Sequence, residues 1–405
     1  MSTSREAALT LEETRAFEAA RILFPGALSQ AYIDVASRGL LPVDAPQLAY
    51  DHLQQRVLGV ADKYAYFDVV ERARKGIATL LKAHPEEIAI TKNISDGLNM
   101  VANAIDWREG DEVFLCSGIE HPSNLYTWRN LESLGVKLRD FPASDGEFPV
   151  DAVIQALHDS RSARVVAVSA TSFVPGYRAD LDRLGAACRL AGVRLVVDGA
   201  QSVGITHIDL ERTPVDALAM STQKGLCSVY GMGFLYVRKE FAEQLKPRYL
   251  ARFGVNIPAT HEADYDRGPL KFKSGALRFD LGNYNFLAAT LVTRTLDLVN
   301  GLGTQAIDRH VSNLAHHLAM GLSAIDAPVR VPKPGHGANI VCVESRMGQA
   351  PAEALQKYLK ECGVQAALRR NVVRFSFHLY NNTDDVMAVL SACASWLKEN
   401  RRSLG

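Results

Sequence analysis

The sequence predicts an α/β protein with a mostly parallel, seven-stranded sheet flanked by helices, followed by a smaller α+β C-terminal domain. Seven short apolar runs between residues 87 and 237 show little alternation of polar and apolar residues, which is typical of strands covered by helices on both faces. Longer segments of helical period separate these runs, and the pattern changes after about residue 283.

The predicted strands and helices alternate along the chain. In order, the strands are EIAIT (87–91), EVFLC (112–116), VKLRD (136–140), VVAVS (165–169), RLVVD (194–198), DALAM (216–220) and GFLYV (233–237). The helices expected in this part of the chain are 68–83, 95–105, 123–134 and 180–191. Strands and helices that alternate in this way form a largely parallel sheet.

The pattern after residue 282 differs. A long helix is expected at 284–300, followed by the run GANIVCVES, a helix at 351–362, the strand VVRFSF and a last helix at 383–398. We therefore expect a large α/β domain over 46–282 and a small α+β domain over 283–405. Residues 1–45 fit neither pattern, and we expect them to pack on the small domain or at the entrance of the functional site.

Composition and charge exclude several classes of protein. The chain has 45 Lys plus Arg and 45 Asp plus Glu, so its composition gives no sign of the basic stripe that nucleic acid or an anionic membrane surface would require, and we expect no partner of either kind. No apolar stretch approaches the ~20 residues of a membrane span, and the N-terminal residues are too polar for a signal peptide. The six cysteines include no C-x-x-C pair. These features predict a globular, cytoplasmic protein with reduced cysteines.

Polar side chains follow four of the predicted strands, at the points where the strands end. Ligands of open α/β sheets collect at the carboxyl ends of the strands, so we expect these side chains to form one site. Those we single out are Ser95, Glu120, His121, Asp198, Gln201, Ser221, Gln223 and Lys224.

This set of side chains matches the needs of pyridoxal 5′-phosphate. The cofactor requires a lysine amine for its Schiff base, a carboxylate that keeps its ring nitrogen protonated, and a phosphate site at the start of a helix. Lys224 and Asp198 supply the first two. Taken singly, a loop lysine would be a surface residue and a strand-end aspartate a turn former, so the prediction depends on their joint placement. Lys224 would also move the α-proton of the substrate.

Nine motifs are spread over most of the chain. They read YIDVASRGLLP from residue 32, TKNISDGLNMVA, EHPSN, SFVPGYRADL, VVDGAQSVG, STQKG, GMGFLYVRK, RFDLGNYN and VRFSFHLYNNTDD from residue 373. As a set they resemble the class V aminotransferase and cysteine desulfurase-like family of fold type I pyridoxal-phosphate enzymes, which includes selenocysteine lyase-like and isopenicillin N epimerase-like proteins.

The resemblance implies a role for individual residues. It implies that His121 stacks on the cofactor ring, that Gln201 contacts the ring hydroxyl, and that Arg374 holds the substrate α-carboxylate, for which a guanidinium is well shaped. It also implies a homodimer in which Asn283 reaches the phosphate of the other subunit's cofactor. The phosphate contacts that it implies within one subunit are Ile94, Ser95, Ser221 and Gln223.

Two departures from the desulfurase pattern concern the reaction. A cysteine desulfurase needs a thiolate shortly before the carboxylate-binding arginine, whereas CGVQAALRRNVVR, from Cys362 to Arg374, has no cysteine in its middle. Cys362 and Cys227 both lie in contexts that favour packing, and Phe173 stands where the desulfurase pattern commonly has asparagine. We therefore predict aminotransferase-type chemistry on an α-amino acid, with C–S or β-elimination, epimerisation and desulfuration as alternatives.

Two other classes fit the sequence less well. A nicotinamide-dependent oxidoreductase needs a G-x-G-x-x-G turn after an early strand, whereas GMGF at residue 231 leads into a strand. A non-catalytic relative would have little reason to keep Lys224, Asp198 and His121 together. The sequence leaves the identity of the amino acid open. Candidates for the entrance of the site are Tyr126, Trp128, Tyr177, Arg369 and Arg370.

Overall fold

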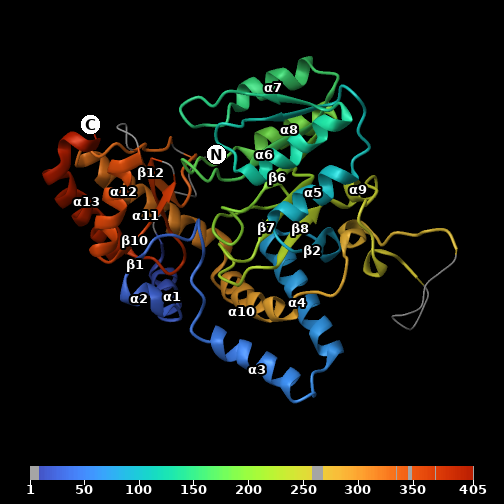
Figure 1. Cartoon of the computed structure of the whole chain (residues 1–405), viewed down its shortest axis with the longest axis horizontal. Coiled ribbons are helices and arrows are strands. Elements are labelled where there is room, and N and C mark those ends of the chain that lie inside the picture. Colours follow the sequence, from blue (N-terminus) through green and yellow to red (C-terminus); the bar gives the residue numbers. More distant parts are fainter. Residues whose placement is uncertain (1–8, 258–267, 334, 345–348, 370, 405) are drawn as a thin grey trace.

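The computed structural model describes residues 9–257, 268–333, 335–344, 349–369 and 371–404. Its centre is a seven-stranded sheet with the strand order β2-β8-β7-β6-β5-β3-β4 (Figure 1). The strands are β2 Ile88–Thr91, β3 Glu112–Leu115, β4 Lys137–Asp140, β5 Ala163–Ser169, β6 Arg194–Asp198, β7 Ala217–Ser221 and β8 Gly233–Val237. Strand β8 is antiparallel to both of its neighbours, and the other pairs are parallel. The predicted α/β fold class is confirmed.

Both faces of this sheet are covered by helices. The α-helices of this region are α4 Lys63–Leu81, α5 Ile94–Ala104, α6 Pro122–Arg129, α7 Val150–Asp159, α8 Leu181–Ala191, α9 Lys239–Ala242 and α10 Phe286–Leu302. Short 3-10 helices are η1 Pro85–Glu87, η2 Asn130–Leu134, η3 Arg252–Gly254 and η4 Gly275–Phe279. Leu195 and Val197 of β6 pack in a core with α4 and α8, whereas Val196 packs in a second core with α5. Successive side chains point to opposite faces, and both faces are covered, so the three middle residues of the strand are all apolar.

A smaller sheet lies to one side of the large one, among the segments coloured orange to red in Figure 1. Its three antiparallel strands have the order β11-β12-β9, which leaves β11 at an edge. The elements of this region are α11 Thr304–Ala324, β9 Ile340–Glu344, α12 Gln349–Glu361, β10 Val364–Gln365, β11 Ala367–Arg369, β12 Val372–Ser376 and α13 Thr383–Leu404. The division of the chain at residues 45/46 and 282/283 stays a prediction.

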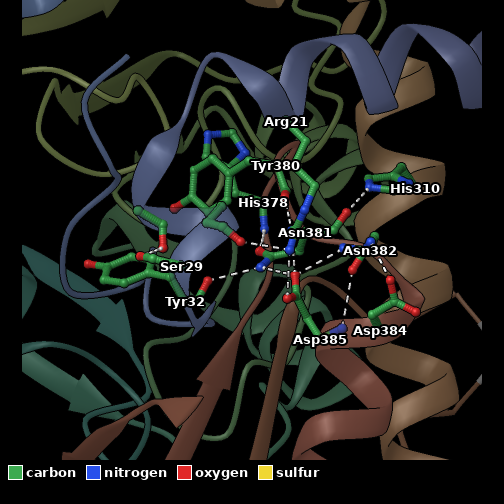
Figure 2. A network of polar contacts seen from close by, with 12 residues as sticks. Arg21, Ser29, Tyr32, His310, His378, Tyr380, Asn381, Asn382, Asp384 and Asp385 are labelled. Carbon is green, nitrogen blue, oxygen red and sulfur yellow. Dashed lines mark hydrogen bonds and ion pairs between the residues drawn. The ribbon is translucent and has the colours of Figure 1, made fainter. Parts of the chain in front are cut away.

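The described part of the N-terminal segment is fixed to this second region. Its elements are α1 Leu11–Ile22, α2 Pro25–Ser29 and β1 Ala31–Tyr32, and β1 pairs with β10. The next helix, α3 Ala45–Val57, packs on α10 instead. Figure 2 shows the polar network that holds the N-terminal segment. Arg21 Nη1 donates to Asp385 Oδ2 at 2.8 Å, and Asn381 Nδ2 donates to the carbonyl oxygen of Tyr32 at 2.9 Å. These bonds place the chain that follows β1 beside β12.

Residues 33–40 run from the small sheet to the loop after β7. Asp34 forms a bridge with β12, and Gly39 N donates to the carbonyl oxygen of Gln223 at 2.9 Å. A Cβ atom on Gly39 would collide with the carbonyl oxygen of Lys224, so only glycine permits this close approach. The N-terminal segment therefore helps to shape the loop that carries Lys224. Across the described part of the chain, no helix combines the length and apolarity needed to cross a bilayer.

Candidate active site

A cavity of about 480 Å³ opens at the carboxyl edge of the seven-stranded sheet, facing β11 and β12 of the small sheet. Loops that follow β3, β5, β6 and β7 supply one side of it, and residues 36 and 37 with the small sheet supply the other. The described residues that line it are Ala36, Ser37, Gly118, His121, Pro122, Phe173, Val174, Gln201, Lys224, Arg369, Asn371, Val372 and Arg374. The structure thus brings four predicted site residues, His121, Gln201, Lys224 and Arg374, to one cavity.

Lys224 lies in the loop just after β7. Burial lowers the pKa of its amine to about 8, and the positive charges of Arg374 and Arg369 act in the same direction. The carboxylate of Asp198 opposes this shift. An amine with such a pKa is partly unprotonated near neutral pH, which a nucleophile or a base requires.

Asp198 ends β6, the strand beside β7, and is only 3% exposed. Its Oδ1 accepts a hydrogen bond from Ala200 N at 2.9 Å. Burial raises the pKa of this carboxyl, while the Ala200 N–H and the charge of Lys224 lower it. The two strand ends therefore place an acid and an amine, both desolvated, within electrostatic reach of each other.

A second buried carboxyl, Glu120, supports the turn that carries His121. It accepts hydrogen bonds from Ser169 N at 2.8 Å, from Ser169 Oγ at 2.5 Å and from Asn124 Nδ2 at 2.8 Å. Burial raises its pKa to about 7, and the charge of Asp198 acts in the same direction. Ser169 is the register partner of Asp198 on β5. Sequence reasoning placed Glu120 at this strand end but gave it no role.

His121 caps the N-terminus of α6. Its Nδ1 accepts a hydrogen bond from Ser123 N at 3.2 Å, and its ring meets that of Phe173 edge to face, with centroids 5.3 Å apart. Burial lowers the pKa of the imidazole, and the charges of Lys224 and the two cavity arginines lower it further. These effects favour the neutral form of the ring.

Two buried polar atoms near the strand ends have no hydrogen-bond partner among the described residues. They are Gln201 Oε1 and Ser221 Oγ. Gln201 is held by its other amide atom, because Nε2 donates to the carbonyl oxygen of Ala36 at 3.1 Å. A buried polar group without a partner is costly, so both atoms are suited to a polar ligand.

The first turn of α5 lies close to the end of β7. Gly97 permits this approach, since a Cβ atom there would lie 3.1 Å from the Cβ of Ala219. Asn93 caps the helix by accepting a hydrogen bond from Asp96 N at 2.9 Å. Gly233, the register partner of Ser221, lies so close to the start of α5 that a Cβ atom on it would be 3.1 Å from Asn93 Cα. A helix N-terminus near a serine hydroxyl suits a phosphate. The predicted phosphate contacts Ile94, Ser95, Ser221 and Gln223 are at these two places, outside the lining of the 480 Å³ cavity.

Arg374 reaches the cavity from β12 and is 1% exposed. Its Nη1 donates to the carbonyl oxygen of Phe173 at 3.1 Å, and its Nη2 donates to Ser37 Oγ at 3.0 Å. Arg369 Nη2 donates to the same hydroxyl at 2.7 Å. Burial lowers the pKa of Arg374 to about 10, as does the charge of Arg369, whereas Asp34, 3.9 Å away, raises it.

Other predicted residues lie elsewhere. Asn283 is exposed, has a left-handed backbone with φ 47° and does not line the cavity. Tyr126 is exposed, while Trp128 and Tyr177 are buried, and none of the three is a lining residue. Arg369 is the entrance candidate that lines the cavity, and Arg370 lies outside the described residues. Ser37 was not predicted as a site residue, because nothing in the sequence around it indicates that it contacts Arg369 and Arg374, which are more than three hundred residues away.

The cysteines do not line the cavity in the described part of the chain. Cys362 is exposed and follows the end of α12, and Cys227 is buried, which raises the pKa of its thiol. The described residues also contain no cluster of His, Cys, Asp and Glu side chains that could hold a metal ion. Among the described residues, the cavity therefore has neither a cysteine thiol nor a metal site.

Comparison with known proteins gives one family and a consistent fold. The family model described as Aminotransferase class-V matches residues 55–389. A "Probable cysteine desulfurase" of Pyrococcus abyssi is 29% identical over 82% of this chain and 84% of its own length. The "Uncharacterized aminotransferase YcbU" of Bacillus subtilis is 26% identical over 93% of this chain and 96% of its own length.

Solved structures show the same fold. A cysteine desulfurase from Thermococcus onnurineus NA1 matches with a TM-score of 0.83 at 23% identity, covering 97% of this chain and 100% of that one. The cystine C-S lyase C-DES, in complex with cysteine persulfide, matches with a TM-score of 0.80 at 23% identity, covering 92% and 99%.

Proposed function

Because the chain belongs to the class-V aminotransferase family, we propose that it is a pyridoxal-phosphate-dependent enzyme that acts on an α-amino acid with Lys224 as its catalytic amine. One observation carries this proposal. The amine of Lys224 and the carboxylate of Asp198 are desolvated at the ends of two neighbouring strands, beside a cavity that Arg374 enters from the opposite side.

The residues present fit pyridoxal phosphate. The unpartnered Gln201 Oε1 suits the ring hydroxyl, and the unpartnered Ser221 Oγ beside the start of α5 suits the phosphate. Asp198 would hold the ring nitrogen, His121 would lie on the ring, and Lys224 would bind the aldehyde carbon. The remaining phosphate contacts that we propose are Ile94, Ser95 and Gln223.

The protein groups then divide the work of the reaction. When bound, the cofactor supplies an electron sink for the charge that develops at the α-carbon. Lys224, with a pKa near 8, takes the proton from the α-carbon and can return it. Asp198 would keep a proton on the ring nitrogen. Arg374 would hold the α-carboxylate, for which a guanidinium is well shaped, and His121 would lie against the cofactor ring.

We propose aminotransferase-type chemistry as the reaction. It needs the α-proton step and no thiol from the protein, which agrees with a cavity whose described lining includes no cysteine. Elimination at a C–S bond is the second candidate. It also needs no protein thiol, and the solved relative C-DES is described as a cystine C-S lyase. Desulfuration through a persulfide on the protein is disfavoured for the same reason.

The test is covalent capture of the cofactor followed by a substrate panel. The purified protein should absorb visible light, and borohydride should fix the cofactor to Lys224. Lys224→Ala should abolish this fixation and lower turnover on the order of 10⁴-fold or more. Lys239→Ala, at a partly exposed lysine paired with Glu86, is the control and should change neither. An adduct that persists at another lysine would overturn the assignment.

The same protein with a panel of amino acids would separate the reactions. Transfer of the amino group to an added keto acid, without release of ammonia, signals transamination. A keto acid that appears together with ammonia, and with sulfide where the substrate contains sulfur, signals elimination. Inversion at the α-carbon signals epimerisation. Aminotransferase-type chemistry predicts stoichiometric transfer of the amino group to a keto acid. Release of ammonia without transfer would favour elimination instead.

We also propose a cytoplasmic homodimer. All six cysteines are free thiols, which agrees with a reducing compartment. The segment from 41 to 64 exposes large apolar side chains, including Leu53 and Val57 of α3, which agrees with a covered surface. Asn283, exposed and outside its own cavity, is free to serve the other subunit. The mass in solution tests this, and a monomer at micromolar concentration would exclude it.

A further inference from the structure

The substrate side of the cavity carries more positive charge than one carboxylate can balance. Arg369 and Arg374 both line the cavity, and none of the described lining residues is acidic. Asp198 lies within electrostatic reach of Lys224, so it belongs to the cofactor side. The carboxylate near Arg374 is Asp34, at 3.9 Å, and burial raises its pKa although the charges of Arg374 and Arg369 act against this shift. A single carboxylate leaves one of the two guanidinium charges unbalanced.

The two guanidinium groups share a neutral acceptor. Both Nη2 atoms donate to Ser37 Oγ, at 3.0 Å from Arg374 and 2.7 Å from Arg369. Their Nη1 atoms donate to main-chain carbonyl oxygens, those of Phe173 and Leu368. The Nε of Arg374 is buried and has no hydrogen-bond partner among the described residues. Charged donors bind anionic acceptors more strongly than neutral ones, so this arrangement is suited to anions.

The cofactor phosphate does not account for these two arginines. Its proposed contacts lie at the start of α5 and at the end of β7, and none of them lines the cavity with the arginines. A helix N-terminus and neighbouring hydroxyls are a sufficient phosphate site. The arginine pair is therefore left for the substrate.

We infer that the substrate is an α-amino acid whose side chain ends in a second negatively charged group, and that Arg369 binds that group. The inference rests on the proposed function, which assigns the α-carboxylate to Arg374. Arg374 is fully buried on the inner strand β12, whereas Arg369 is half-buried on the edge strand β11. The deeper arginine thus suits the carboxylate next to the reacting carbon, and the shallower one suits the end of the side chain.

Aspartate and glutamate are the simplest substrates of this class. Asparagine and glutamine have the same shapes but present a neutral amide, whose N–H groups would face the N–H groups of Arg369. A site built for a charged hydrogen-bond partner rejects an analogue that lacks it, so we expect a preference for the acids of at least about 100-fold in kcat/KM.

The experiment compares acids with amides on the holoenzyme and its variants. Arg369→Gln should lower kcat/KM for the preferred acid by about 100-fold and for its amide by less than about fivefold. Arg369→Lys should recover part of the loss, because it restores the charge but not the fork. Arg374→Gln should lower kcat/KM for acid and amide alike. Arg38→Gln removes an exposed arginine outside the described cavity lining and is the matched control.

A binding measurement supplies a readout that does not depend on turnover. Succinate and glutarate carry two carboxylates and no amine, whereas butyrate carries one carboxylate. Calorimetry on the wild-type holoenzyme should give a Kd at least about tenfold lower for a dicarboxylate than for butyrate. Arg369→Gln should remove this difference, and Arg38→Gln should keep it.

Two results would overturn the inference. Turnover of the amides at the rate of the acids would show that no second charge is recognised. An equal loss for acids and amides in Arg369→Gln would show that Arg369 and Arg374 hold the same α-carboxylate. Failure of the proposed function looks different, because then borohydride traps no cofactor and no amino acid reacts, while dicarboxylate binding still reports on Arg369.

Discussion

The cavity has two walls that differ in how their charges are compensated. We call one the cofactor wall: Gln201 and Lys224 line it, and the buried Asp198 acts on Lys224 through its charge. We call the other the substrate wall, which consists of Ser37, Arg369 and Arg374. In the cofactor wall, a carboxylate and an amine of opposite charge influence each other's pKa. In the substrate wall, two guanidinium groups of like charge both donate hydrogen bonds to one hydroxyl oxygen, that of Ser37.

This difference indicates a division between reaction and recognition. The acid and the amine of the cofactor wall are held in place whether or not a substrate is bound. This is what we expect of groups that serve the same proton transfer for every amino acid. According to the proposed function, the two arginines of the substrate wall gain an anionic partner when a substrate binds, so substrates with different charged groups should be bound with different affinities. Changes in the first wall should thus slow all substrates, and changes in the second should discriminate among them.

The largest effect that tests this division is expected at Asp198. Asp198→Asn keeps the shape of the side chain but removes the charge that holds a proton on the ring nitrogen. Exchange of the substrate α-proton with solvent should slow by at least about 100-fold for every amino acid that the enzyme accepts. Proton exchange can be followed by NMR in deuterated buffer.

Asp216 provides a matched control for that variant. It is also a buried aspartate with a pKa raised by burial, but it precedes β7 at the opposite edge of the sheet and accepts a hydrogen bond from Leu195 N at 2.8 Å. Asp216→Asn should lower the melting temperature and leave the exchange rate within about threefold. Equal exchange rates in Asp198→Asn and the wild type would show that the ring nitrogen lies elsewhere.

The cofactor wall was predictable from the sequence because strand ends are local features. Each run of apolar residues marks a strand, and parallel strands end at one edge, so Asp198, Gln201 and Lys224 could be brought together without a structure. All seven predicted strands of the large sheet overlap observed ones. The roles of these residues remain proposals.

The substrate wall was less predictable because it joins distant segments. Arg374 followed from family resemblance, but no periodicity connects Ser37 with β11 and β12, which lie more than three hundred residues later. Helix α11 was also absent from the prediction, although its buried residues, such as Ile307, Val311 and Leu314, recur at helical spacing. Helix α3 was absent from the prediction as well. It exposes Tyr50, Leu53 and Val57, so its sequence lacks the buried apolar stripe by which a helix is recognised.

The pH dependence of cofactor binding to Lys224 tests both walls at once, because charged groups of both walls change the pKa of this one amine. Only the unprotonated amine reacts, so the capture rate of cofactor-free protein should rise about tenfold per pH unit and level off above about 8. An unperturbed lysine would level off near 10.4. Growth of visible absorbance after mixing with pyridoxal phosphate gives the rate.

Variants of each wall should move this plateau in opposite directions. Arg374→Met removes a charge that lowers the pKa of Lys224, so its plateau should shift to higher pH. Asp198→Asn removes a charge that raises this pKa, so its plateau should shift to lower pH. A wild-type plateau near pH 10, or shifts of the same sign in both variants, would show that the walls do not act on Lys224 as described.

The smallest effect is expected at the cysteines, and it separates this enzyme from one that passes sulfur to a thiolate. Cys362 is exposed after α12, and Cys227 is buried, so neither is in a position to receive sulfur from a substrate in the described cavity. Cys362→Ser should change turnover by less than about twofold, as a surface substitution does. Cys227→Ser should lower the melting temperature and keep turnover within about threefold.

Both variants are assayed with cysteine and with a sulfur-free amino acid. If either variant lost activity on cysteine while α-proton exchange continued, that thiol would be the sulfur acceptor, and the substrate wall would serve desulfuration instead.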